Sequence, residues 1–177
     1  MDMTKLSLIR LSLADQSACE DFMQEFVAAG ETDYGWLNEY REYSFPEYLA
    51  FLQAGERGEF KPEIYVPQTV FWLSTPQGQL LAVSRLRHRL NPGLEIEGGN
   101  IGYAVRPSVR RQGVATHLLG LVLDQARLIG LTRVLVTCDH DNTGSARTIE
   151  KNGGVLEDQR ISPESGKLIK RYWIELV

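Results

Sequence analysis

The stretch of this sequence best suited to chemistry is a basic turn at residues 106–115, Arg-Pro-Ser-Val-Arg-Arg-Gln-Gly-Val-Ala. It precedes an apolar segment that predicts a helix, and a helix N-terminus exposes unpaired N–H groups and the positive end of the helix dipole. Gly113 and Ala115 are small enough to let a bulky anion reach those amides, while Arg110 and Arg111 add positive charge. The turn therefore has the chemistry of a diphosphate-binding site, with an ordinary basic loop as the alternative.

Two other phosphate motifs do not fit this turn. No Gly-Lys-Ser/Thr follows it, which excludes a Walker A loop, and the glycines at 98, 99 and 102 precede the predicted strand's end, which excludes a dinucleotide fingerprint. The three histidines are far apart and only two cysteines, Cys19 and Cys138, are present, so we predict no metal site and no disulfide scaffold. Cys138 ends a predicted buried strand, where a thiol usually packs without reacting.

Hydrophobic patterning predicts the elements that position the turn. Ser44 and Glu47 have capping-box spacing at the start of a helix, and the turn at 75–78 predicts a hairpin. We expect segment 31–43 to be a loop or short helix and 91–93 to be a turn. The expected elements are strands at about 6–11, 69–74, 79–88, 99–105, 134–138, 155–161 and 168–176, and helices at about 17–30, 44–55, 114–129 and 145–152.

Composition limits the class of protein. A chain of 177 residues with 43% hydrophobic residues and a net charge of −4 fits one folded domain, 1–177, better than a disordered segment. No apolar run suits a membrane span and no signal peptide is recognisable, so we expect a cytoplasmic protein. Residues 1–67 carry 13 acidic and 5 basic side chains, and residues 68–177 carry 10 acidic and 14 basic ones. Either this charge is scattered over the surface, or one part serves a cation and the other an anion.

Two separated blocks of the sequence resemble the GNAT N-acetyltransferase family. The turn, as Arg110-x-x-Gly113-x-Ala115, matches the family's (Gln/Arg)-x-x-Gly-x-(Gly/Ala) signature. The segment at 142–153, Asn-Thr-Gly-Ser-Ala-Arg-Thr-Ile-Glu-Lys-Asn-Gly, resembles its second conserved block. The element order covers most of the chain, and residues 98–157 are the most specific part. The runs at 86–91 and 98–108 also resemble a bacterial subgroup of predicted acetyltransferases, which indicates no particular acceptor.

The resemblance implies the GNAT fold, an α/β fold with a mixed, mostly antiparallel sheet of six or seven strands, about four helices and a central parallel pair that splays apart. Here strands 101–105 and 134–138 would hold the pantetheine arm of acetyl-CoA between them. Residues 1–67 would border the acceptor and 68–177 would form the acetyl-CoA-binding core. The residues implied to bind acetyl-CoA are Tyr103, Ala104, Val105, Arg110, Arg111, Gln112, Gly113, Val114, Ala115, Thr116, Asn142 and Ser145.

Backbone groups of strand 101–105 would pair with the pantetheine and polarise the thioester carbonyl, and the amides at 111–116 would take the pyrophosphate. Asn142 either contacts the pantetheine or only caps the following helix. The family often has a tyrosine in the second block that protonates the leaving thiolate. Ile149 stands at that position here, so we expect Tyr103 or water to act instead, or the thiolate to leave unprotonated.

The acceptor amine needs a base within reach. The candidates before the turn are Glu97, Glu95 and His88, and those after the other splayed strand are Asp139 and His140. His88 has the most suitable ordinary pKa, although a surface histidine among arginines is the alternative.

We therefore expect an acetyl-CoA-dependent N-acetyltransferase that acts by direct transfer, in a ternary complex, on a primary amine of a small molecule or peptide. The acidic first part favours a cationic amine, and homodimers are common in the family. One alternative is a non-catalytic acyl-CoA-binding module, which the missing tyrosine favours. The other is a nucleic-acid-binding protein, which the negative net charge and the lack of a reader motif disfavour. We expect no nucleic acid, membrane or metal partner.

Overall fold

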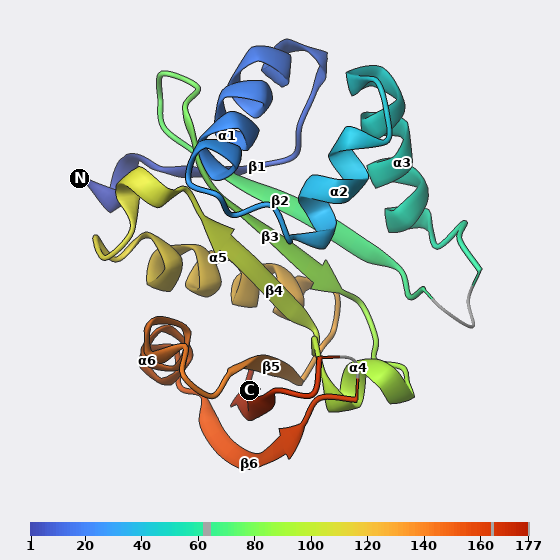
Figure 1. Ribbon diagram of the computed structural model, residues 1–177, viewed down its shortest axis with the longest axis vertical. Coiled ribbons are helices and arrows are strands. Elements are labelled where there is room, and N and C mark those ends of the chain that lie inside the picture. Colours follow the sequence, from blue (N-terminus) through green and yellow to red (C-terminus); the bar gives the residue numbers. More distant parts are fainter. Residues whose placement is uncertain (62–64, 164, 177) are drawn as a thin grey trace.

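The computed structural model describes residues 1–61, 65–163 and 165–176, and within them two antiparallel sheets form the centre of the molecule (Figure 1). The first sheet has the strand order β1-β2-β3-β4, and the second has the order β5-β7-β6. The strands are β1 Ser7–Ile9, β2 Gln68–Ser74, β3 Leu80–Arg87, β4 Ile101–Val105, β5 Arg133–Asp139, β6 Val155–Ile161 and β7 Leu168–Glu175. This arrangement is the expected mixed, mostly antiparallel architecture, divided into two sheets.

Six α-helices in the described chain cover these sheets, where about four were expected. They are α1 Gln16–Ala28, α2 Gly35–Arg41, α3 Phe45–Arg57, α4 Pro92–Ile96, α5 Val114–Leu128 and α6 Thr143–Lys151. Helices α1 to α3 lie over one face of the first sheet, and α5 lies over the other (Figure 1). Because strand side chains alternate, Trp72 of β2 packs with Phe22 of α1, whereas the neighbouring Leu73 packs in the core of α5.

Local sequence signals set the ends of α3. Ser44 and Glu47 form the predicted capping box, in which the Ser44 amide donates to the Glu47 carboxylate at 2.9 Å. The helix runs to Arg57, two residues past the expected end at about Gly55, and Gly58, with a φ of +71°, is its C-terminal cap. Gly58 rather than Gly55 stops it because the left-handed C-terminal cap falls there.

The structure corrects the expected turn at 91–93. Asn91 Oδ1 accepts a hydrogen bond from the Leu94 amide at 2.9 Å and caps α4, with Pro92 in the first helical position. Asn followed by Pro is typical both of a turn and of the start of a short helix, so the residue types alone did not distinguish the two structures. The segment at 31–43 contains the short helix α2, one of the two forms expected for it.

Strands β4 and β5 meet only where they begin. The Asn100 amide donates to the Leu135 carbonyl at 2.7 Å, and Asn100 Oδ1 accepts from the Leu135 amide at 2.9 Å. A Cβ at Gly99, whose φ is +60°, would lie 2.3 Å from the Leu135 carbonyl oxygen, so this approach requires glycine. Beyond it, and among the described strands, β4 pairs with β3 alone and β5 with β7 alone, so β4 and β5 separate and open a wedge.

Ion pairs join the acidic first part of the chain to the basic second part. They connect Arg85 to Glu39, Arg106 to Asp21 and Glu25, and Arg110 to Glu31. The uneven charge of the sequence is therefore partly internal, because acids of α1, α2 and the loop after α1 neutralise arginines of β3 and the basic turn. No helix in the described ranges is long and apolar enough to cross a membrane.

Candidate functional site

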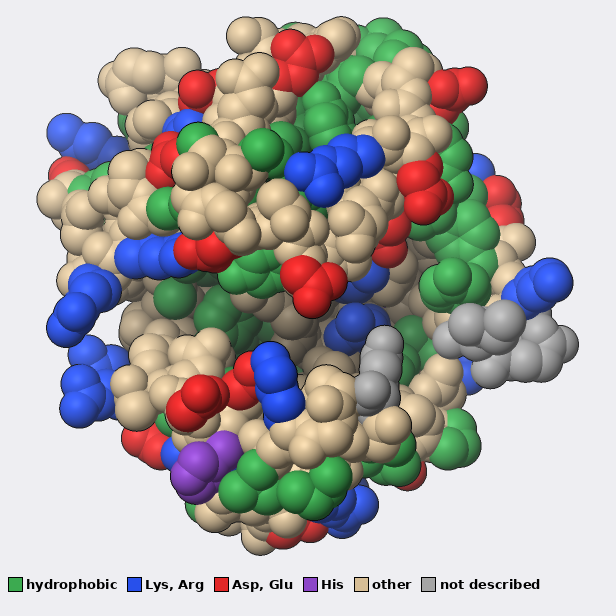
Figure 2. Space-filling view, in the orientation of Figure 1, with side chains coloured by type: hydrophobic (Ala, Val, Ile, Leu, Met, Phe, Trp, Pro, Cys, Tyr) green, Lys and Arg blue, Asp and Glu red, His purple; other side chains and the backbone are tan. Residues whose placement is uncertain are grey.

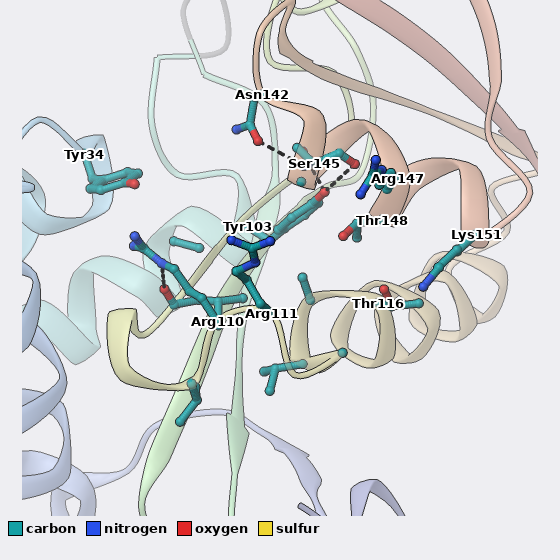
Figure 3. A pocket seen from close by; sticks show the side chains of 17 residues that line it. Tyr34, Tyr103, Arg110, Arg111, Thr116, Asn142, Ser145, Arg147, Thr148 and Lys151 are labelled. Carbon is teal, nitrogen blue, oxygen red and sulfur yellow. Dashed lines mark hydrogen bonds between the residues drawn. The ribbon is translucent and has the colours of Figure 1, made fainter.

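A cleft of 550 Å³ lies where β4 and β5 separate, between the end of β4, the first turn of α5 and one face of α6 (Figure 3). Nearly all the residues implied to bind acetyl-CoA lie in its wall. They are Tyr103, Ala104, Val105, Arg110, Arg111, Gly113, Val114, Ala115, Thr116, Asn142 and Ser145. The structure thus brings α6 together with β4 and the basic turn around one space, although α6 begins at Thr143, well after the turn ends at Ala115.

The start of α5 forms one end of this cleft. Gly113 caps the helix with a φ of +86°, and Val114, Ala115 and Thr116 follow in its first turn. The amides of a first helical turn have no acceptor within the helix, so they are available to an anion. Arg111 has a φ of +61°, a conformation that non-glycine residues adopt rarely, and it turns the chain into the helix.

Three cationic side chains surround the first turn of α5: Arg111, Arg147 and Lys151 (Figure 3). None of them forms an ion pair within the part of the chain that the structure describes. Sequence reasoning missed Arg147 and Lys151 as site residues, although their spacing of four places both on the same face of α6. Together these charges make this end of the cleft suitable for phosphate groups.

Arg110 lies in the wall of the cleft and also pairs with an acid outside that wall. Its guanidinium makes two hydrogen bonds with the Glu31 carboxylate at 2.5 and 2.7 Å, and its Nε donates to the Val105 carbonyl at 2.9 Å. This interaction is the first cause that holds the pKa of Glu31 below its ordinary value. Arg110 therefore braces the basic turn against the segment after α1, and its charge is already neutralised.

Gln112 is exposed, and it is not among the residues in the wall of the cleft; the expected contact of its backbone amide with the pyrophosphate stays a prediction. Its side-chain nitrogen is 3.4 Å from the Ser108 carbonyl oxygen, a contact within the turn. The reason is geometric: the left-handed Arg111 and Gly113 on either side reverse the chain at this residue.

Tyr103 points from β4 toward α6, and its hydroxyl lies 2.7 Å from Ser145 Oγ (Figure 3). The Ser145 amide in turn donates to Asn142 Oδ1 at 3.0 Å, so Asn142 caps α6. Burial raises the pKa of Tyr103 to about 12, so its hydroxyl keeps its proton at neutral pH. Ile149 is fully buried in the core behind the cleft, so the tyrosine hydroxyl that reaches α6 here comes from Tyr103 of β4.

Glu97 lies at the junction of β4 and β5. Its carboxylate accepts a hydrogen bond from Ser162 Oγ, and the amide of the next residue, Gly98, donates to Thr137 Oγ1 of β5 at 3.0 Å. Glu97 is not in the wall of the 550 Å³ cleft, but it lies where the two strands begin to separate. At this position Glu97 could contact an acceptor that approaches β4 from the side opposite the cleft.

Glu95 and His88 are less well placed. Glu95 is exposed, and its carbonyl accepts from Arg171 Nε at 2.9 Å. His88 Nε2 lies 2.9 Å from Thr69 Oγ1 of β2, on the side away from β5, and burial lowers the pKa of this histidine. Neither residue lines the cleft. Among the described residues, no group of three or more His, Cys, Asp or Glu side chains could hold a metal ion.

Comparison with known families gives a match over most of the chain. Residues 12–155 match the family model described as the acetyltransferase (GNAT) domain. No curated protein sequence matches the chain.

Solved structures give the same fold at low sequence identity. A putative acetyltransferase, yncA from Salmonella typhimurium with acetyl-CoA, is 17% identical with a TM-score of 0.65, covering 98% of this chain and 95% of its own. A spermidine N-acetyltransferase SpeG chimera from Vibrio cholerae and hSSAT is 16% identical with a TM-score of 0.66, and the match covers 97% of this chain and 96% of the chimera. The RimL ribosomal L7/L12 alpha-N-protein acetyltransferase with CoA is 18% identical with a TM-score of 0.69, and the match covers 97% of this chain and 94% of RimL. The acceptors named for the last two differ, so the shared fold does not identify an acceptor.

Proposed function

Because the chain belongs to the GNAT acetyltransferase family and is therefore an N-acetyltransferase with acetyl-CoA as its co-substrate, we propose that it transfers the acetyl group directly to a primary amine of a small molecule or peptide. The observation that carries this proposal is the cleft between β4 and α6, which ends at the free amides of α5. Its volume of 550 Å³ and its three cations suit a large co-substrate with a pantetheine arm and phosphates.

In this proposal, the co-substrate's pyrophosphate binds the amides at Gly113 to Thr116, and its phosphate charges face Arg111, Arg147 and Lys151. The pantetheine arm follows the edge of β4 that no strand pairs. Backbone amides there would donate to the thioester oxygen as negative charge develops on it. Residues 1–67, which include α1 to α3, would border the acceptor.

The proposed reaction has two proton transfers. The amine nitrogen attacks the thioester carbon, the C–S bond breaks, and the amine's proton must leave. Glu97 would take that proton as general base, and the Tyr103 hydroxyl would give a proton to the leaving thiolate. Ser145 would orient that hydroxyl, since the two oxygens are 2.7 Å apart.

Two measurements test the proposal. Calorimetry with acetyl-CoA should show binding, and thiol release across a panel of amines and peptides should show turnover that depends on the amine. Tight acetyl-CoA binding without turnover of any amine or peptide would instead support a non-catalytic acyl-CoA-binding module. Nucleic-acid binding has little support, because Arg106 is buried against Asp21 and Glu25 and does not contribute to a basic surface.

A further inference from the structure

Two arginines near the end of β3 lie on the face of the first sheet opposite α5. Arg85 forms an ion pair with Glu39 of α2, and the two side chains are 18% and 22% exposed. Arg87 lies two residues further along, so strand alternation places it on the same face. Its Nη1 donates to the carbonyls of Gly98 and Gly99 at 3.2 and 3.0 Å.

Positive charge is in excess at this point. Arg87 has no carboxylate partner in the described chain, whereas Arg85 shares Glu39. Burial, followed by the like charge of Arg85, lowers the pKa of Arg87 to about 10, so the guanidinium is still charged at neutral pH. Two cations and one anion leave one unneutralised positive charge in a partly buried position, which is costly without a bound counter-charge.

The space beside these arginines is open. Gly102 of β4 pairs with Arg85 across the sheet, and a Cβ built on Gly102 would meet no heavy atom within 4 Å. Figure 2 shows a hollow in the middle of this face, with Lys or Arg side chains at its floor, over the end of β3 and between α2 and α4 as placed in Figure 1. A glycine in a strand often marks the close approach of a ligand.

This hollow lies across β4 from the acetyl-CoA cleft. Successive strand residues point to opposite faces, so Tyr103 reaches Ser145 of α6 while Gly102 faces the arginines. Glu97, the proposed base, directly precedes Gly98, whose carbonyl binds Arg87. An acceptor in the hollow would therefore meet the thioester at β4, with its amine near Glu97 and the rest of the molecule near the two arginines.

We propose that the acceptor carries a carboxylate in addition to its amine, as an amino acid does, and that Arg87 together with Arg85 binds that carboxylate. Guanidinium groups suit this role because they bind carboxylates through paired hydrogen bonds. This inference rests on the proposed function of the same site. It narrows the expectation of a cationic amine acceptor, because Glu39, the acid of the first part that faces β3 here, is already paired with Arg85.

The test compares amines that differ only in the carboxylate. Thiol release from acetyl-CoA is measured with L-α-amino acids, β-alanine, 4-aminobutyrate and dipeptides, each beside its C-terminal amide, and with propylamine and spermidine. We expect the best acceptor to be an acid whose kcat/KM exceeds that of its amide by about tenfold or more, the usual scale for a hydrogen bond to a charged group. A best acceptor without a carboxylate, or equal rates for acid and amide, would overturn the inference.

Variants assign the effect to the arginines. Arg87→Met should bring the acid-to-amide ratio close to one, whereas a merely structural role would lower both rates and keep the ratio. Arg89→Met, an exposed arginine two residues away, is the matched control and should keep the ratio. Arg87 also holds the Gly98 and Gly99 carbonyls, so its loss could disturb the backbone there. The second variant therefore combines Arg85→Met with Glu39→Gln, which removes both charges of the Arg85–Glu39 pair and leaves neither unpaired. An unchanged ratio in both variants would refute the assignment.

Calorimetry separates this inference from the proposed function. If acetyl-CoA binds and no amine reacts, the proposed direct transfer fails. The CoA-loaded protein should still bind the acids about tenfold more tightly than their amides if the arginines recognise a carboxylate. Equal binding of both, or no binding of any acid, would overturn the inference whatever the turnover.

Discussion

The Tyr103 hydroxyl lies 2.7 Å from Ser145 Oγ, and this contact joins β4 to α6 at the mouth of the wedge between β4 and β5. The two residues are 42 positions apart in the chain. Ser145 is itself oriented by the cap that Asn142 makes at the start of α6. A tyrosine on the strand thus provides a hydroxyl at α6, where the helix itself has the buried Ile149.

Removal of that hydroxyl tests its role as the acid. We expect Tyr103→Phe to lower kcat by about 100-fold, because the thiolate would leave without its proton donor, and to change acetyl-CoA affinity little. Stopped-flow thiol release and calorimetry measure the two quantities. Tyr172→Phe is the control, since it also removes a buried hydroxyl, 3.2 Å from Glu150, but outside the cleft wall. An unchanged kcat in Tyr103→Phe would assign the proton to water.

Glu97 should act as the base for the acceptor amine. Glu97→Gln keeps the shape of the side chain but removes its basicity, so we expect turnover to fall about 100-fold or more while acetyl-CoA affinity stays the same. Glu95→Gln, exposed on the same segment, is the matched control and should stay active. If His88→Gln lost activity and Glu97→Gln did not, the histidine would be the base.

Gly113 should be required at the start of α5. Gly113→Trp places a bulky side chain beside the amides and strains a φ of +86°, so we expect acetyl-CoA affinity to fall at least about 100-fold. Gly78→Trp is the matched control: its φ is +84°, it has nothing within 4 Å of an added Cβ, and it lies in the hairpin turn between β2 and β3. It should lose about 1–2 kcal/mol of stability and keep its affinity. Equal affinity for both variants would argue against binding at this turn.

The two cations of α6 should contribute to co-substrate binding through charge. We expect Arg147→Met and Lys151→Met each to weaken acetyl-CoA binding by about tenfold at low salt and by less at high salt, because ions screen exposed charges. Arg57→Met is the control, because Arg57 is the exposed last residue of α3, where it pairs with Glu59. Calorimetry at two ionic strengths measures the effect, and a loss independent of salt would indicate packing instead of charge.

The Arg110–Glu31 pair should make stability depend on acid pH. Arg110 holds the pKa of Glu31 below its ordinary value of 4.5, so the pair's contribution is complete above that value and is lost as the pH falls through the lower folded pKa. We expect Glu31→Gln to cost about 1 kcal/mol at neutral pH and nothing at the lowest pH. Chemical denaturation at several pH values measures this, and a cost that is the same at every pH would contradict it.

Local patterns in the sequence determined most of the elements and the basic turn at one end of the cleft. The capping box at Ser44 and the periodic apolar face of α1 predicted helices that the structure contains. The start of α5 at Gly113 followed from the basic turn and the apolar run after it. These features depend on residues close together in the chain, whose interactions are the same in any fold that keeps the helix or strand.

Only the tertiary structure decided which charges are available and what each side chain meets. Arg110 and Arg111 are adjacent in the sequence and both line the cleft, yet Arg110 is neutralised by Glu31, 79 residues away, while Arg111 has no ion-pair partner within the described ranges. In the same way, Arg87 lacks a carboxylate partner among the described residues and Arg85 has one. Ion pairs and open space depend on distances between elements that come together on folding, and the spacing of residues along the chain does not specify those distances.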